Sequence, residues 1–315
     1  MSRLPRCTSR ARLTMRRTVL LVLLAGCRAC SLEDDVDGQA FTRCGAVDAP
    51  EARVERAGRL ALRIEGRTLE VLEPPPTLRI AAFTGPVGSR FGKGELALLA
   101  RAKADLALYL GGLGDDEGTA TDNLRALARV GVPTLFVPGG ADRLPLIEAA
   151  FAALTPPERA LMIDASGLHA LRIGSDRFAL VAGAALGRYA VAADACGFAA
   201  RDVEAIRAAL GEGAPGERTW LVSWHAPAGF GVGDGPEGSE LGSPDLKGLA
   251  FALGARGGLF AYPEVQAVRP GRGPLALVVP RLGRAGVVRA DGSRVAASVA
   301  LVARSAEGLR ALQFP

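Results

Sequence analysis

The side chains that could do chemistry are few and lie far apart in the sequence. The chain has 315 residues, with 2 histidines, His169 and His225, and a Pro-Gly-Gly-Ala-Asp run that ends at Asp142. One imidazole with two carboxylates can hold a zinc ion, so His225, Asp142 and Glu264 form a candidate mononuclear site if their loops converge. A lone histidine at a strand end, here beside Trp224, is more often a buried structural residue than a metal ligand. The interpretation without a metal is therefore favoured.

Motifs of other enzyme classes are missing from the sequence. It contains no Gly-x-Ser-x-Gly nucleophile elbow, and Lys93 is followed by Gly94-Glu95 where a phosphate-binding loop has serine or threonine after its lysine. A pairing of Cys196 with His225 as nucleophile and base has no supporting motif. Covalent catalysis and nucleotide-dependent reactions are therefore not expected.

The basic character of the chain resides in its first residues. The formal net charge is +5, from 38 lysines and arginines against 33 acidic residues, and six of the arginines lie within residues 1–26, which contain no acid. Without these six, the acidic residues slightly outnumber the basic ones. Nucleic-acid binding needs basic residues gathered on the folded domain, so no nucleic-acid partner is expected.

The first thirty residues have the pattern of an export signal. Arg16 and Arg17 precede the apolar run 19–24, which is shorter than the roughly 20 residues of a membrane-spanning helix. The run Leu-Ala-Gly-Cys that ends at Cys27 resembles the lipobox of bacterial lipoproteins. That resemblance implies removal of residues 1–26, acylation of Cys27 and anchoring to a membrane of the cell envelope, on its periplasmic or extracellular face.

The cysteines agree with an exported protein. After processing, Cys30, Cys44 and Cys196 remain beside the acylated Cys27. Cys30 and Cys44 bracket a short polar segment, so we expect a disulfide between them in an oxidising compartment and a reduced Cys196. The acidic residues between them match a calcium loop poorly, and we expect residues 27–58 to form a solvated tether.

A hairpin and a proline-rich spacer are expected next. Apolar and polar residues alternate over 60–65 and 68–72, with Gly66 placed first in a two-residue turn, which predicts a β-hairpin. Three prolines follow at 74–76, so we expect the hairpin and spacer to occupy residues 59–75 and the main domain to begin at residue 76.

The main domain reads as an α/β fold. Hydrophobic residues make up 49% of the chain, which is typical of a folded protein. Short apolar runs alternate with helical patterns and predict strands at 78–83, 106–110 and 134–137 and helices near 95–102, 123–130 and 144–153. This βαβ order predicts a largely parallel sheet whose site lies in the loops at the carboxyl ends of the strands. Further strands are expected at 168–173, 178–181, 219–223, 258–261, 275–279 and 298–303, and a helix is expected to begin at Ser243-Pro244.

The loops after these strands resemble those of the calcineurin-like metallophosphoesterases. The framing residues of the family's five site loops are found at 84–88, 110–112, 137–142, 223–227 and 261–264. The resemblance covers residues 76–315 and implies two facing β-sheets flanked by helices, an αββα sandwich. In that family the loops hold two metal ions, which activate a water molecule against a phosphoester.

The resemblance does not extend to the metal ligands. At most of its ligand positions the family has an aspartate, an asparagine or a histidine, and this chain has a different residue type. The replacing residues are Gly85, Val87, Gly112, Gly140, Ala141, Tyr262 and Glu264. His225 matches a ligand position, and Asp142 matches a neighbour of the ligands. Glycine, alanine and valine offer no lone pair to a cation, so no metal or other cofactor is expected.

The sequence therefore predicts a lipid-anchored envelope protein whose metallophosphoesterase-like domain is catalytically degenerate and has a binding or scaffolding role. The former cleft is expected to be lined by Gly85, Gly112, Gly140, Asp142, Trp224, His225, Tyr262 and Glu264. It would suit a neutral small molecule or an envelope protein better than a phosphate dianion, which needs cations or arginine. The alternative is an active phosphoesterase with a remodelled or mononuclear divalent-metal site, with His225 and Asp142 as its catalytic candidates.

Overall fold

The computed structural model describes residues 42–86, 88–185, 194–229, 241–262, 275–278 and 299–312. Expectations for Cys27, Cys30, Val87 and Glu264 lie outside these residues. The chain divides into residues 1–32 and residues 33–315, and all the described residues belong to the second unit. Within the described part of the chain, no helix combines the length and the apolar character needed to cross a membrane.

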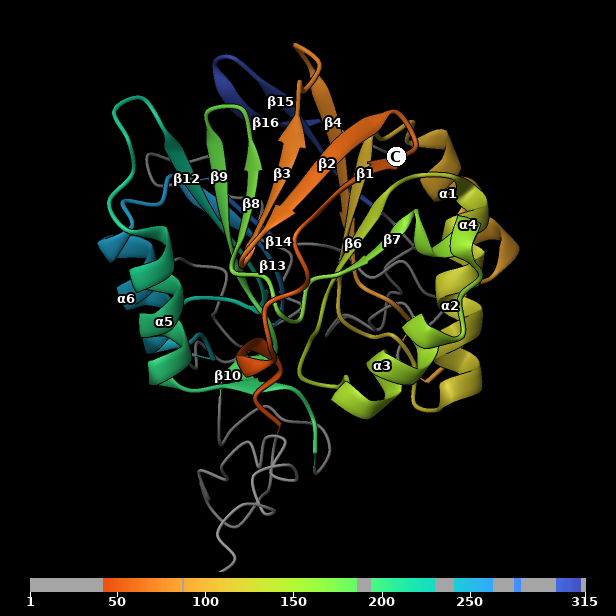
Figure 1. Cartoon of the computed structure of the whole chain (residues 1–315). Helices are drawn as coiled ribbons and strands as arrows, with labels where there is room; N and C mark the ends of the chain where they lie inside the picture. Colours follow the sequence, from red (N-terminus) through yellow and green to blue (C-terminus); the bar gives the residue numbers. More distant parts are fainter. Residues whose placement is uncertain are drawn as a thin grey trace, which may run out of the picture. The chain divides into compact units, whose positions relative to one another are not determined.

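Two β-sheets form the body of this unit (Figure 1). The larger has the strand order β1 (Arg53–Ala57), β2 (Leu60–Glu65), β3 (Thr68–Leu72), β8 (Ala170–Ile173), β9 (Asp176–Val181), β12 (Arg218–His225), β13 (Gly257–Tyr262) and β14 (Leu275–Val278). The smaller has the order β16 (Gly308–Leu312), β15 (Ala300–Ser305), β4 (Leu78–Phe83), β5 (Leu106–Leu110), β6 (Thr134–Val137) and β7 (Met162–Asp164). A short third sheet pairs β10 (Ala184–Ala185) with β11 (Gly197–Phe198).

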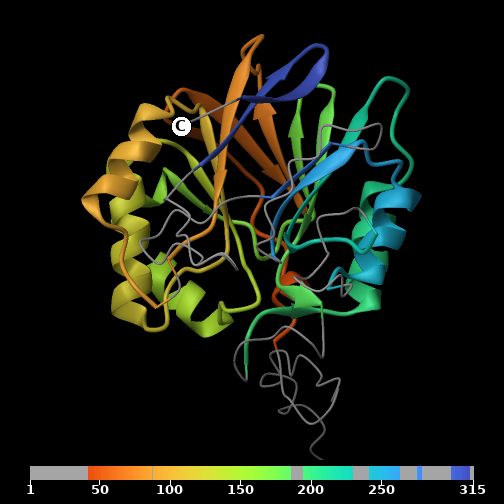
Figure 2. The ribbon, with the colours of Figure 1, turned by 180° about the vertical axis from the view of Figure 1, so that it is seen from behind.

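Helices cover the outer faces of the two sheets, as Figures 1 and 2 show from opposite sides. The smaller sheet carries α1 (Lys93–Arg101), α2 (Glu117–Val130), α3 (Leu144–Ala152) and α4 (Pro156–Arg159), and the larger carries α5 (Ala200–Leu210) and α6 (Pro244–Ala252). The predicted αββα sandwich is confirmed. The predicted start of α6 is confirmed as well, because the Ser243 hydroxyl caps the helix by accepting from the Leu246 N–H.

The core between the sheets follows from the residue pattern of each strand. In β2 the apolar residues Leu60, Leu62 and Ile64 are buried while the residues between them are partly or fully exposed, so one face of the strand packs inward. All five residues of β5 are buried, because this central strand is covered on both faces. Residues from both sheets join one apolar cluster, which holds the sandwich together.

An ion cluster joins the sheets at the end where β12 begins. Asp176 is 1% exposed and accepts hydrogen bonds from Arg218 at 2.8 Å, from Trp220 at 2.9 Å and from Arg304 at 2.8 Å. Arg218 and Trp220 lie on β12 of the larger sheet, whereas Arg304 lies on β15 of the smaller sheet. The carboxylate is therefore shared between the two layers, with a cation from each.

The hairpin prediction is confirmed, but the domain boundary after it is wrong. β2 and β3 pair from Ala61–Leu72 to Glu65–Thr68 around Gly66, which has φ +56°. β3 also pairs in parallel with β8, and β1 pairs with β2, so all three strands belong to the larger sheet. The tether expected over 27–58 therefore already contains a strand. The pattern missed β1 because four of its five residues are partly or fully exposed.

The expected Cys30–Cys44 disulfide is wrong as well. Cys44 is bonded to Cys196, 152 residues further along the chain, and both side chains are fully buried. The backbone N–H of Thr42 donates to the Ala195 carbonyl at 3.0 Å, which brings the two cysteines side by side. Cysteine spacing alone cannot reveal a pairing that the tertiary fold creates, and so Cys196 was expected to be reduced.

Candidate functional site

The site expected from the sequence lies where the loops after β4 and β5 meet. These strands are parallel neighbours, with Phe83 opposite Tyr109, so their carboxyl ends reach the same edge of the smaller sheet. The Gly85 N–H donates to the Gly111 carbonyl at 2.9 Å. A Cβ atom built on Gly112 would lie 3.0 Å from the Gly85 carbonyl oxygen. The backbones of the two loops are thus in direct contact at two of the family's ligand positions.

The Tyr109 hydroxyl fills the space beside Gly85. It donates to the Gly112 carbonyl at 2.6 Å, and burial raises the pKa of Tyr109 well above its ordinary value. The ring is held by stacking on Phe83, with centroids 5.2 Å apart, and by an edge contact with Phe136. A Cβ on Gly85 would overlap with the Tyr109 hydroxyl and the Gly112 carbonyl oxygen. An aspartate therefore does not fit at position 85 in this backbone.

Asp142 joins the β5 loop to the β6 loop. Its carboxylate accepts from the N–H of Leu113 at 2.7 Å, from the N–H of Gly139 at 2.7 Å and from the N–H of Gly112 at 3.1 Å. The residue is 1% exposed. Burial raises the pKa of Asp142 to about 6, although the three backbone donors oppose that rise. The group is an anion surrounded by partial positive charges.

Trp224, on β12 of the larger sheet, packs against the same loops. A Cβ on Gly111 would lie 2.7 Å from Cδ1 of the indole, and a Cβ on Gly139 would overlap with the ring. Gly111 also has φ +72°, which disfavours any side chain there. The indole thus occupies the space above two glycines and leaves no room for longer side chains at either position.

The His225 ring has hydrogen-bond partners at both nitrogens. The N–H of Ala185 donates to Nδ1 at 3.0 Å, and Nε2 lies 2.8 Å from the Leu241 carbonyl oxygen. Because Nδ1 accepts, the proton is on Nε2 and the imidazole is neutral. Burial lowers the pKa of His225, which keeps the ring neutral. His169 lies elsewhere, with Nε2 3.4 Å from the Gly45 carbonyl oxygen.

The described residues of these loops do not fit a two-metal centre. Glycines replace the carboxylate and amide ligands, and the space beside them is filled by neighbouring atoms. Both nitrogens of His225 and the carboxylate of Asp142 are already engaged in hydrogen bonds, so the mononuclear alternative lacks a free imidazole. Across the residues that the structure describes, no group of three or more histidine, cysteine or acidic side chains is placed to hold a metal ion.

The structure brings together part of the expected set. Gly85, Gly112, Asp142 and Trp224 lie in one cluster, and Gly140 is buried in the same β6 loop. The imidazole of His225 contacts Ala185 and Leu241, and the backbone of Tyr262 pairs with that of His225 in neighbouring strands. Val87 and Glu264 lie outside the described residues. Sequence reasoning missed Tyr109, whose polar tip was hidden in the apolar run Leu106–Leu110.

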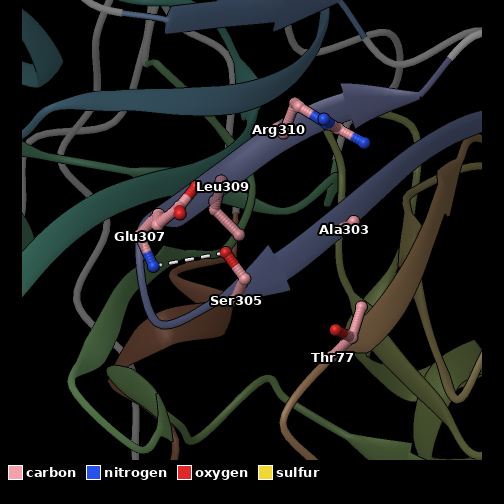
Figure 3. Close-up of a pocket in the computed structure, with 7 residues that line it drawn as sticks. Thr77, Ala303, Ser305, Glu307, Leu309 and Arg310 are labelled. Carbon is pink, nitrogen blue, oxygen red and sulfur yellow. Dashed lines mark hydrogen bonds between the residues drawn. The ribbon is translucent and has the colours of Figure 1, made fainter.

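A pocket of about 430 Å³ lies away from this cluster, against the β15–β16 hairpin (Figure 3). Its lining includes Ser305, Glu307 and Arg310 of the hairpin, together with Thr77. Thr77 precedes β4 whereas Gly85 follows it, so the pocket and the glycine cluster lie at opposite ends of that strand. The Glu307 N–H donates to the Ser305 hydroxyl inside the hairpin.

Comparison with known proteins identifies the fold and nothing finer. No family model and no curated protein matches the chain. One crystal structure matches with a TM-score of 0.54 at 14% identity, over 76% of this chain and all of that chain. The crystal structure of TT1561 of Thermus thermophilus matches with a TM-score of 0.51 at 15% identity, over 76% of this chain and all of that one. These two structures share the fold of this chain. At such identity the likeness does not extend to activity.

Proposed function

We propose that this protein is a lipoprotein of the bacterial cell envelope whose phosphoesterase-like domain binds or scaffolds a partner and does not hydrolyse phosphoesters. The anchor is the acylated Cys27, and residues 1–26 are removed. The partner is an envelope protein or a neutral small molecule. No divalent cation takes part in this role.

The observation that carries the proposal is the filled space at Gly85. A catalytic site that had merely lost one ligand would keep room for the metal and the remaining ligands. Here the Tyr109 hydroxyl and the Gly112 carbonyl occupy the position that a side chain at residue 85 would need. His225 is the residue that matches a family ligand, and both of its ring nitrogens are hydrogen-bonded to backbone groups. The donor set of the described loops therefore supports a role other than metal-dependent hydrolysis.

The catalytic half of the proposal is tested on the full chain purified in detergent. We expect zinc, manganese and iron far below one ion per chain, and no hydrolysis of bis(p-nitrophenyl) phosphate above the rate of His225→Ala with added Mn²⁺. His169→Ala is the matched control, because it removes the other histidine of the chain, which lies away from the cluster. Stoichiometric metal, together with a rate that falls in His225→Ala and not in His169→Ala, would show a working phosphoesterase.

The anchor is tested separately by metabolic labelling. Cells grown with labelled palmitate should incorporate it into the wild-type protein, which should sediment with membranes. Cys27→Ser should abolish both results. Cys7→Ser is the control, since Cys7 lies within the segment that is removed and its loss should change neither. An unlabelled, soluble wild-type protein would refute the anchor and leave the catalytic question open to its own test.

A further inference from the structure

Asp142 is the point at which three segments of the chain meet. Its carboxylate accepts from Gly112 and Leu113 of the β5 loop and from Gly139 of its own β6 loop. Its backbone carbonyl accepts from the N–H of Cys196 at 2.7 Å. Cys196 is in turn bonded to Cys44, so the segment that donates to the Asp142 carbonyl is fixed covalently to the segment around Cys44. Every one of these hydrogen-bond partners is a backbone N–H group.

We propose that the Asp142 carboxylate is the positioning group of this site, taking over the loop-organising task that cations have in two-metal phosphoesterases. The sign of the central charge is opposite to that in a two-metal site. Where metal ions gather anionic side chains from several loops, this anion gathers the N–H dipoles of the β5 and β6 loops. The inference deepens the proposed function and rests on it, because an anion can serve as the organising centre only if no cation does.

The geometry supports this role in two ways. One carboxylate bridges both loops, since Oδ1 accepts from Leu113, Oδ2 accepts from Gly139, and the Gly112 N–H lies 3.1 Å from each oxygen. The carboxylate is shielded from bulk solvent, because the residue is 1% exposed, so its N–H partners depend on it for an acceptor. Removing the carboxylate would leave three converging N–H donors without an acceptor. Such a site should accept a small carboxylate from solution.

The test is chemical rescue of Asp142→Ala by sodium formate, with sodium chloride at equal ionic strength. We expect a lower melting temperature for Asp142→Ala than for wild type, recovered in part by formate and not by chloride. The matched control is Asp164→Ala, which removes a half-buried carboxylate that accepts from the backbone N–H and the hydroxyl of Ser166. Formate should not rescue this variant beyond the effect of chloride.

Hydrogen exchange of the wild-type protein gives a second readout that does not depend on a variant folding. The amides of Gly112, Leu113 and Gly139 should exchange slowly in EDTA and at the same rate with added Mn²⁺. In Asp142→Ala they should exchange about tenfold faster or more, and formate should slow them. Fast exchange of these amides in wild type, or equal rescue by formate and chloride, would overturn the inference.

Metal content separates the two proposals. If the wild-type protein holds no metal and Asp142→Ala has the same melting temperature as wild type, the role of Asp142 is overturned. The proposed function is then unaffected. A wild type that holds stoichiometric metal and loses its slow amides in EDTA overturns both, because cations would then organise the loops.

Discussion

Two buried aspartates mark the two ends of the sandwich, and they are held by opposite means. Asp176 lies where β12 begins and accepts from two arginines and Trp220. Asp142 lies near the other end of the same strand, where Trp224 packs on the loops, and its carboxylate accepts from the backbone N–H groups of two loops. Both are 1% exposed, so burial alone does not distinguish them.

The difference appears in how each carboxyl group titrates. Burial raises the pKa of Asp176, but the hydrogen bonds from Arg218, Trp220 and Arg304 outweigh it and leave the pKa below its ordinary value. Burial raises the pKa of Asp142 to about 6, because backbone dipoles compensate the charge less than full cations do. Asp176 thus stays ionised to low pH, whereas Asp142 is ionised at neutral pH and takes up a proton as the pH falls through about 6.

The largest effect is expected when the ion cluster loses its anion. Asp176→Asn should reduce the free energy of unfolding by about 3–5 kcal/mol, because Arg218 and Arg304 would stay buried without their partner. Denaturant unfolding at pH 7 measures the loss. Glu70→Gln is the control, since the Arg63–Glu70 pair is exposed and should contribute less than about 1 kcal/mol. Equal losses in the two variants would refute the distinction.

The pH dependence of stability should separate the two aspartates. The folded pKa of Asp142 is raised, so the native state binds this proton more tightly, and stability is lost as pH rises from about 4 to about 6. The loss should approach about 3 kcal/mol, on the order of 1.4 kcal/mol per pKa unit. The folded pKa of Asp176 is lowered, so its contribution is present above about pH 4 and lost below it.

The measurement is the unfolding free energy of wild type minus that of Asp142→Asn, followed from about pH 3.5 to about pH 8. Subtraction is needed because burial lowers the pKa of His225, whose stabilising contribution is lost as pH falls through this range. The difference should fall with rising pH between about 4 and 6 and be flat above that range. A difference that rises with pH would mean that Asp142 titrates like Asp176.

Smaller effects should follow from adding a methyl group at the glycine cluster. Gly85→Ala should reduce the free energy of unfolding by about 2 kcal/mol or more, because its Cβ would overlap with Tyr109 and Gly112. Gly94→Ala is the matched control, since nothing lies within 4 Å of a Cβ there and the residue is in helix α1. That variant should be up to about 1 kcal/mol more stable than wild type. Equal denaturation midpoints for the two variants would contradict close packing at Gly85.

The smallest expected effect is the removal of a single hydroxyl. Tyr109→Phe keeps the stacked ring but leaves the Gly112 carbonyl without this donor, at a cost of about 1 kcal/mol. Thermal unfolding compares it with Phe91→Tyr, which adds a hydroxyl to a neighbouring ring of the same aromatic cluster. A Tyr109→Phe variant more stable than wild type would show that the hydroxyl is not needed to fill the site.

Much of this fold could be predicted from residue patterns, although helix α5 was missed even though Val203, Ile206 and Leu210 recur on one face of it. Strands with strong apolar character, such as β4 and β5, were placed correctly because burial of one or both faces leaves a clear pattern. β1 was missed because most of its side chains face solvent, and β10 is only two residues long. Contacts between distant segments leave no local pattern.

The same limit applies to the candidate site. The positions of Gly85 and Gly112 in loops after strands correctly predicted that they lie at the carboxyl ends of β4 and β5. The sequence could not show that Tyr109 fills the space beside them, or that Asp142 accepts from the backbone, since both facts depend on how the loops pack. The disulfide between Cys44 and Cys196 was missed because the residues that place the cysteines side by side come from separate elements.

The position of β15 bears on how quickly this protein can fold. β15 pairs with β4 in the register Ala300–Ala82, so a strand from the end of the chain completes the smaller sheet beside one of its first strands. Pairings between such distant segments form slowly, because a long loop must close before any contact compensates the lost entropy. Until then the β4 edge is open to other chains, and newly made protein is most prone to aggregate during that interval.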